Sequence, residues 1–147
     1  MGGSAFGAIL STTAFPRLPP AVYKALKARL YPKLADLYTW VGVPVEAPEK
    51  VDHGDLDLLV AIPKPPRMAL VSHEEVKEAI GAKLAIPMDG NRTSNYAVPI
   101  QVGEWGAFGH ADDEEQKRIA SEDGEIYYQV RSKTPTALNR TDPNMTI

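Results

Sequence analysis

The stretch that decides the fold is Asp55-Leu56-Asp57-Leu58-Leu59-Val60-Ala61-Ile62. It is short, rich in aliphatic residues and bounded by glycine and proline, a pattern that predicts a β-strand. Its second half is apolar at successive positions, as in a strand buried on both faces. Because side chains alternate along a strand, Asp55 and Asp57 should project from one face, and Leu56 and Leu58 from the other. We therefore expect a buried strand that carries two carboxylates side by side.

The pair Asp55 and Asp57 predicts metal-assisted phosphate chemistry. Neighbouring like charges repel each other, and a bound divalent cation removes that penalty. Hard oxygen ligands suit Mg²⁺ or Mn²⁺, and proteins usually hold Mg²⁺ through one or two carboxylates together with substrate phosphates. An acid-x-acid pair is also common on surface strands and turns, so this interpretation depends on the rest of the sequence.

The composition is that of one globular domain. The chain has 147 residues, of which 44% are hydrophobic and 24% charged. A net charge of −3 excludes a global basic field for non-specific nucleic-acid binding. The sequence has no cysteine, which excludes disulfides and thiol catalysis and favours a reducing compartment. It also lacks an apolar run of ~20 residues and a secretion signal. We expect an intracellular protein, cytoplasmic or nuclear, that does not enter the membrane.

Apolar periodicity and turn signals predict the other elements. In chain order we expect a helix over 20–41 that is kinked or split at Pro32, a helix over 72–84, a strand over 96–102, an acidic helix or disordered insertion within 103–124, and a strand over 125–130. The second helix has the clearest start, because Ser72 and Glu75 form a capping box.

Two motifs together resemble the DNA polymerase β-like nucleotidyltransferase superfamily: Gly2-Gly3-Ser4 and Asp55-Leu56-Asp57-Leu58. The longer string over residues 44–60 is similar to a fungal and viral branch of that superfamily. In that branch the acid pair follows a lysine-containing loop, in a Gly-Asp-x-Asp setting. The resemblance covers about residues 2–102, and more weakly 125–130.

The resemblance implies an α/β (α+β) fold, with a small mixed β-sheet flanked by helices. It places a nucleotidyltransferase-like domain over residues 1–130 and an irregular or disordered tail over residues 131–147. It implies an enzyme that transfers a nucleotidyl group from a nucleoside triphosphate to a hydroxyl acceptor. The acceptor stays open, and a nucleic acid is one candidate.

The resemblance also assigns roles to residues. Asp55 and Asp57 would be catalytic and would hold Mg²⁺ (or Mn²⁺), one ion at the leaving pyrophosphate and one at the attacking hydroxyl. The Gly-Gly-Ser turn would bind the triphosphate, because glycine lets backbone N–H groups approach phosphate oxygens. The implied nucleotide-binding residues are Gly2, Gly3, Ser4 and Lys50.

Two features depart from the superfamily pattern. Ser4 and Asp55 are 51 positions apart, much more than the usual spacing. The superfamily also carries a third acid on a neighbouring strand, where this chain continues Val130 with Arg131. Glu125 on the same predicted strand is the substitute metal ligand that the sequence offers. The hypothesis that follows is a nucleotidyltransferase that is truncated or degenerate at its C-terminal end, with a tail after Val130 that is not homologous sequence.

Two other functions fit the same residues. The first is a catalytically inactive nucleotidyltransferase-like binding module, which the missing third acid supports. The second is a glycosyltransferase-like enzyme, in which an acid-x-acid pair holds Mn²⁺ and a nucleotide-sugar. The chain is short for that second fold, and the Gly-Gly-Ser motif would have no role in it.

Overall fold

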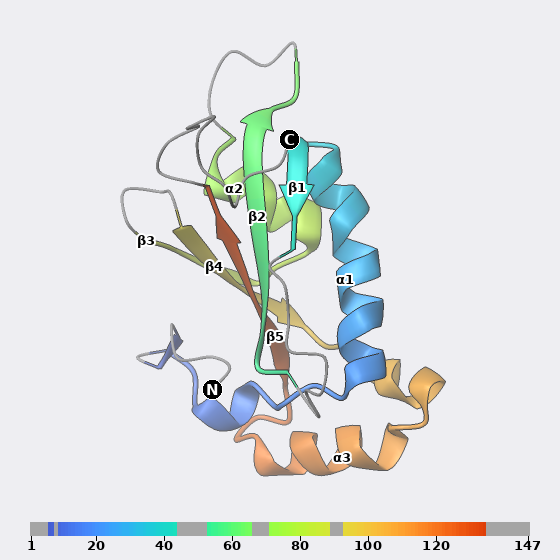
Figure 1. The fold of residues 1–147 in the computed structure, drawn as a ribbon. Coiled ribbons are helices and arrows are strands. Elements are labelled where there is room, and N and C mark those ends of the chain that lie inside the picture. Colours follow the sequence, from blue (N-terminus) through green and yellow to red (C-terminus); the bar gives the residue numbers. More distant parts are fainter. Residues whose placement is uncertain (1–5, 8, 44–52, 66–70, 89–92, 135–147) are drawn as a thin grey trace.

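A single mixed sheet organises the part of the chain that the structure describes. The structure is a computed structural model, and it describes residues 6–7, 9–43, 53–65, 71–88 and 93–134. In chain order the elements are the 3-10 helix η2 (Thr12–Ala14), α1 (Pro20–Ala35), β1 (Tyr38–Gly42), β2 (Asp55–Pro63), α2 (His73–Ile80), β3 (Leu84–Met88), β4 (Thr93–Pro99), the 3-10 helix η4 (Glu104–Phe108), α3 (Ala111–Ala120) and β5 (Tyr127–Lys133) (Figure 1). This architecture confirms the expected α/β (α+β) class.

The sheet has five strands in the order β1-β2-β5-β4-β3. Strands β2 and β5 are parallel, and the other neighbouring pairs are antiparallel. The register aligns Asp55 with Gln129 and Asp57 with Arg131, while Asn95 on β4 is aligned with Arg131 from the other side. Strands β2, β5 and β4, which are distant in sequence, are therefore aligned residue by residue at the acid pair.

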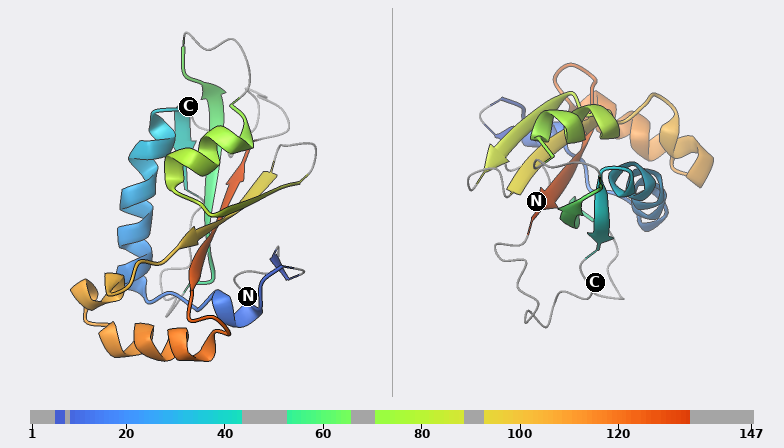
Figure 2. Two further views of the ribbon diagram at one scale, coloured as in Figure 1. Left: turned by 180° about the vertical axis from the view of Figure 1, so that it is seen from behind. Right: turned by 90° about the horizontal axis from the view of Figure 1, so that it is seen from above.

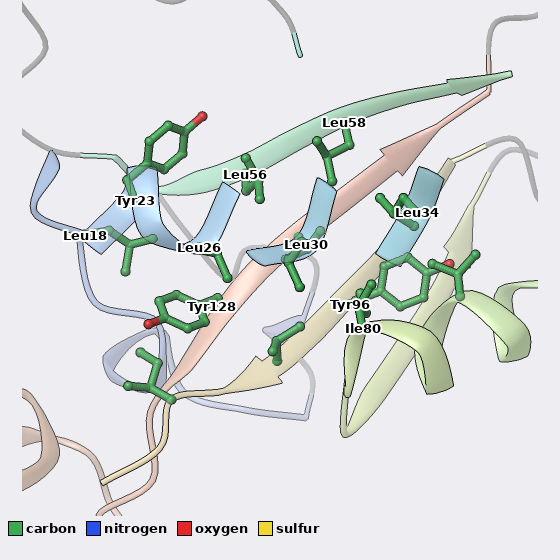
Figure 3. Packing of buried hydrophobic residues seen from close by; sticks show 14 of the residues in the cluster. Leu18, Tyr23, Leu26, Leu30, Leu34, Leu56, Leu58, Ile80, Tyr96 and Tyr128 are labelled. Atoms are coloured by element: carbon green, nitrogen blue, oxygen red, sulfur yellow. The ribbon is translucent and has the colours of Figure 1, made fainter. Parts of the chain in front are cut away.

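Helices α1 and α2 cover one face of the sheet (Figure 2). Helix α1 starts at Pro20, a residue suited to the first helical turn, and turns a leucine stripe toward the strands. The stripe packs on the alternate apolar residues of β2, β4 and β5 (Figure 3). Large members of this main core include Leu18, Tyr23, Leu26, Leu30, Leu34, Leu56, Leu58, Ile80, Tyr96, Trp105 and Tyr128.

The opposite face of the sheet, which we call the second face, is partly covered by the N-terminal segment. Phe6 and Phe15 stack with ring centroids 5.4 Å apart and pack on Ala97 and Tyr127. Helix α3 lies across one end of the sheet (Figure 1). The acid pair lies on the second face, because Leu56 and Leu58 occupy the face under the helices.

The first predicted helix, over 20–41, was wrong in its last six residues. Helix α1 ends at Ala35, and residues 38–42 form the edge strand β1 instead of continuing the helix. Pro32 lies inside α1 without splitting it. It comes three residues before the helix end, so its missing N–H and its ring disturb only the last turns.

The second helix begins as predicted and ends earlier. The Ser72 side chain accepts a hydrogen bond of 3.2 Å from the Glu75 backbone, which confirms the cap. The helix stops at Ile80, because Gly81 takes a left-handed conformation with φ of 73° that glycine adopts without strain. The next residues form β3, which the sequence prediction had assigned partly to the helix.

The last strand also differs from the predicted strand over 125–130 at both of its ends. Strand β5 begins at Tyr127 and continues through Lys133, so the strand passes the boundary that was expected at Val130. The acidic stretch contains η4 and α3, which favours the helical alternative for that part. Among the described residues, no helix is both long and apolar enough to cross a membrane.

Candidate functional site

A cluster of polar side chains lies in the middle of the second face. It consists of Asp55 and Asp57 from β2, Gln129 and Arg131 from β5, and Asn95 from β4, and we call it the polar cluster. The strand register places these residues in two adjacent rows. All five have the strand parity of the second face, opposite to Leu56 and Val130 in the main core.

The guanidinium of Arg131 lies between the two carboxylates. Its Nη2 is 3.9 Å from Asp55 Oδ2, and its Nη1 is 3.8 Å from Asp57 Oδ1. Its Nε donates a hydrogen bond of 3.2 Å to Asn95 Oδ1. The Asp57 side chain is 50% exposed, that of Arg131 38%, and that of Asp55 21%. Asn95 thus orients a tethered cation between the acids, and Asp57 is the acid most open to a ligand.

The buried half of the cluster contains two unsatisfied acceptors. Gln129 Nε2 donates to Asn95 Oδ1 over 3.4 Å, and both residues are almost completely buried. Within the described part of the chain, Gln129 Oε1 and Asp55 Oδ1 are buried oxygens that receive no hydrogen bond. They belong to residues paired in the register. A buried acceptor without a donor costs free energy, so this location favours a proton on Asp55.

The pKa of Asp55 is raised, which agrees with a preference for the protonated form. Burial raises the pKa above its usual value of 3.8, and the charge of Asp57 raises it further. The positive charge of Arg131 acts in the opposite direction but does not outweigh burial. Asp55 therefore holds its proton more strongly than an exposed aspartate does.

The cluster does not fit a divalent metal while Arg131 stays in this position. In the described ranges, no group of three or more histidine, aspartate or glutamate side chains could hold a metal ion. The guanidinium already places a positive charge beside both carboxylates, and a second cation there would be repelled. Mg²⁺ also requires near-octahedral oxygen ligands, which a guanidinium cannot supply.

Glu125, the expected third ligand, lies elsewhere. It precedes β5 and is four residues before Gln129, which corresponds to about 13 Å along an extended chain. Its Oε2 accepts hydrogen bonds from Tyr127 Oη at 2.7 Å and from Lys83 Nζ at 3.1 Å. These two hydrogen bonds lower the pKa of Glu125. The structure therefore does not bring Glu125 to Asp55 and Asp57.

The other predicted site residues cannot be compared with the cluster. Gly2, Gly3, Ser4 and Lys50 lie outside the described residues. Conversely, sequence reasoning missed Asn95 and Gln129 as site residues. Period-two alternation marks Gln129 and Arg131 as sharing a face of β5, but placing Asn95 beside them requires the strand order.

Comparisons with known proteins identified no relative of the chain. No family model, no curated protein and no solved structure matches the chain. The mixed sheet and the chemistry of the polar cluster are therefore the observations that bear on the class of protein.

Proposed function

We propose that the chain is a catalytically inactive, nucleotidyltransferase-like module that binds a nucleotide without a divalent metal. One observation carries the proposal: Arg131 lies between Asp55 and Asp57, with a nitrogen within 4 Å of each carboxylate. The acid-x-acid strand, the mixed sheet and the flanking helices support the resemblance. The arginine at the level of Asp57 argues against the transfer activity that this resemblance would imply.

The chemistry of the cluster explains why binding and not transfer is proposed. Nucleotidyl transfer with two metals needs one ion to activate the attacking hydroxyl and another to stabilise the leaving pyrophosphate. A guanidinium carries one delocalised charge, stays protonated and offers only donors. It neutralises part of the carboxylate charge, but it cannot coordinate and activate a hydroxyl. What remains is a polar surface with the exposed carboxylate of Asp57 and the partly exposed guanidinium of Arg131.

The decisive experiment is a nucleotidyl-transfer assay on the purified chain. Labelled nucleoside triphosphates would be supplied with Mg²⁺ or Mn²⁺ and a mixture of nucleic-acid and protein acceptors. We expect the wild type and the Asp57→Ala variant to give the same background signal. Robust turnover by the wild type that disappears in Asp57→Ala would overturn the proposal and support the active enzyme.

A further inference from the structure

A tryptophan on the edge strand shares the second face with the polar cluster. In the register of β1 with β2, Trp40 is aligned with Ala61, and Gly42 with Leu59. Ala61 and Leu59 have the same strand parity as Asp57, so their partners on β1 project from the same face. Trp40 therefore projects from the same face as the polar cluster, at the level of Ala61, although β1 was expected to be helical.

The indole of Trp40 lies close to Gly42. A Cβ atom built on Gly42 would be only 2.7 Å from Trp40 Cη2 and 2.9 Å from Cζ2. Only glycine leaves room for the ring in this position. Trp40 is half-buried, whereas Trp105 is completely buried in the main core. Gly42 thus leaves space for the Trp40 indole, which we call the aromatic platform.

A cation lies in the same row of the sheet as this platform. Leu59 is aligned with Gly42 on one side and with Lys133 on the other. Two strand spacings, about 10 Å, separate the backbone under the platform from that of Lys133. Lys133 is exposed and has the parity of Arg131, so it belongs to the second face. The adjacent row presents Asp57, whose carboxylate is half exposed.

We propose that the second face binds a nucleoside 5′-phosphate, with its base stacked on Trp40 and its phosphate at Lys133. The exposed carboxylate of Asp57 then accepts hydrogen bonds from the ribose hydroxyls, a role that suits an acid between a base and a phosphate. Stacking on an aromatic ring tolerates every base, so selectivity among bases is low. The inference rests on the proposed function, because it takes the site to work without metal.

The test is isothermal titration of the full chain in EDTA with adenosine 5′-phosphate, adenosine, inorganic phosphate and glucose. We expect the wild type to bind adenosine 5′-phosphate more tightly than adenosine. Trp40→Ala should weaken both by about tenfold or more, as loss of base stacking does. Lys133→Ala should weaken adenosine 5′-phosphate alone. Tyr31→Ala removes an exposed aromatic ring from α1 and serves as the matched control with unchanged affinity.

A second variant separates loss of the platform from loss of the fold. Gly42→Ala keeps Trp40 but forces its ring away, so it should also weaken adenosine, while thermal unfolding checks that each variant is folded. Unchanged affinity in folded Trp40→Ala, or no binding of either adenine compound at millimolar concentration, would overturn the inference. Binding of glucose in place of adenosine would also overturn the inference, and it would indicate that the Trp40 ring stacks on a sugar. Metal-dependent turnover together with binding at Trp40 would refute only the proposed function.

Discussion

At the scale of single residues, Asp55 is an acid whose surroundings favour its neutral form. Its raised pKa means that the folded state holds the proton more strongly than the unfolded state does. The associated stability is fully present below the unfolded value of 3.8 and is lost as the pH rises through the higher folded value. Asp55→Asn keeps the shape, removes the titration and offers an N–H to the unsatisfied Gln129 oxygen.

We therefore expect Asp55→Asn to be more stable than the wild type at pH 7 by up to about 1 kcal/mol, the net value of one hydrogen bond. The difference should shrink as the pH falls toward 4. Urea unfolding between pH 4 and pH 8 measures it. Asp57→Asn is the matched control: its carboxylate is exposed, so this variant should gain nothing. A less stable Asp55→Asn at pH 7 would contradict the raised pKa of Asp55.

We expect Arg131 to control whether the acid pair can bind a cation. Arg131→Asp would replace the tethered charge with a third carboxylate in the row of Asp57. We expect this variant to bind Mn²⁺ at least tenfold more tightly than the wild type, and Mn²⁺ to raise its melting temperature. Lys133→Asp makes the same charge change two residues away on β5. Equal Mn²⁺ affinity in Lys133→Asp would indicate a diffuse electrostatic effect and not a restored site.

At the scale of elements, one buried carboxylate attaches α3 to η4 and to the residue before it. Glu114 accepts hydrogen bonds of 2.9 Å from the backbone N–H groups of Gly103 and Trp105, and one of 3.0 Å from Arg118 Nε. Arg118 also donates to the carbonyls of Ile100 and Gly124. Burial opposes the charged form of Glu114, but these donors outweigh burial and hold its pKa below the usual 4.5.

We expect Glu114→Ala to destabilise the protein by about 3 kcal/mol, because it leaves buried donors and a guanidinium without their acceptor. The carboxylate's contribution to stability is present above the unfolded pKa and is lost as the pH falls through the lowered folded value. Chemical denaturation of the variant at pH 7 measures the loss. Glu115→Ala, one residue further along α3 and exposed, should change stability by less than about 0.5 kcal/mol. Equal losses in both variants would contradict this role of Glu114.

The elements that the sequence predicted are those with strong local signals. The cap at Ser72 and the apolar run of β2 need no knowledge of the tertiary structure. Strand β1 was missed because Leu37 and Val41 continue the helical period of α1, and pairing with β2 outweighs that period. Strand β3 was missed because it is short and contains Pro87, which an edge strand tolerates since one side of its backbone is unpaired.

At the scale of the whole molecule, the candidate site depends on strand pairing between residues that are far apart in the sequence. Alternation alone predicted that Asp55 and Asp57 share a face, and Arg131 was recognised as standing where an acid was expected. The positions of Asn95 and Trp40 depend on which strands become neighbours across gaps of many residues. Those neighbours are fixed by long-range packing and not by local propensity, so the structure had to supply two of the five cluster residues, Asn95 and Gln129.

Cores on both faces of one sheet should make the described residues unfold as one unit. The main core contains Leu30, and the core on the second face contains Phe15. Substitution to alanine typically costs about 2–5 kcal/mol for a buried leucine and about 3–5 kcal/mol for a buried phenylalanine. Because both cores share β4 and β5, Leu30→Ala and Phe15→Ala should each shift the same single transition.

The measurement combines two probes of urea unfolding at pH 7. In a Trp40→Phe background, fluorescence of the buried Trp105 reports the main core, and far-ultraviolet circular dichroism reports the helices and the sheet. We expect the two curves to coincide in this background and in both variants made in it, because neither core can lose its strands while the other keeps them. Phe108→Ala, which truncates a partly exposed ring on η4, is the control with a smaller shift. A Phe15→Ala variant that melts in two steps, with Trp105 fluorescence retained after the first, would show that the second face unfolds separately.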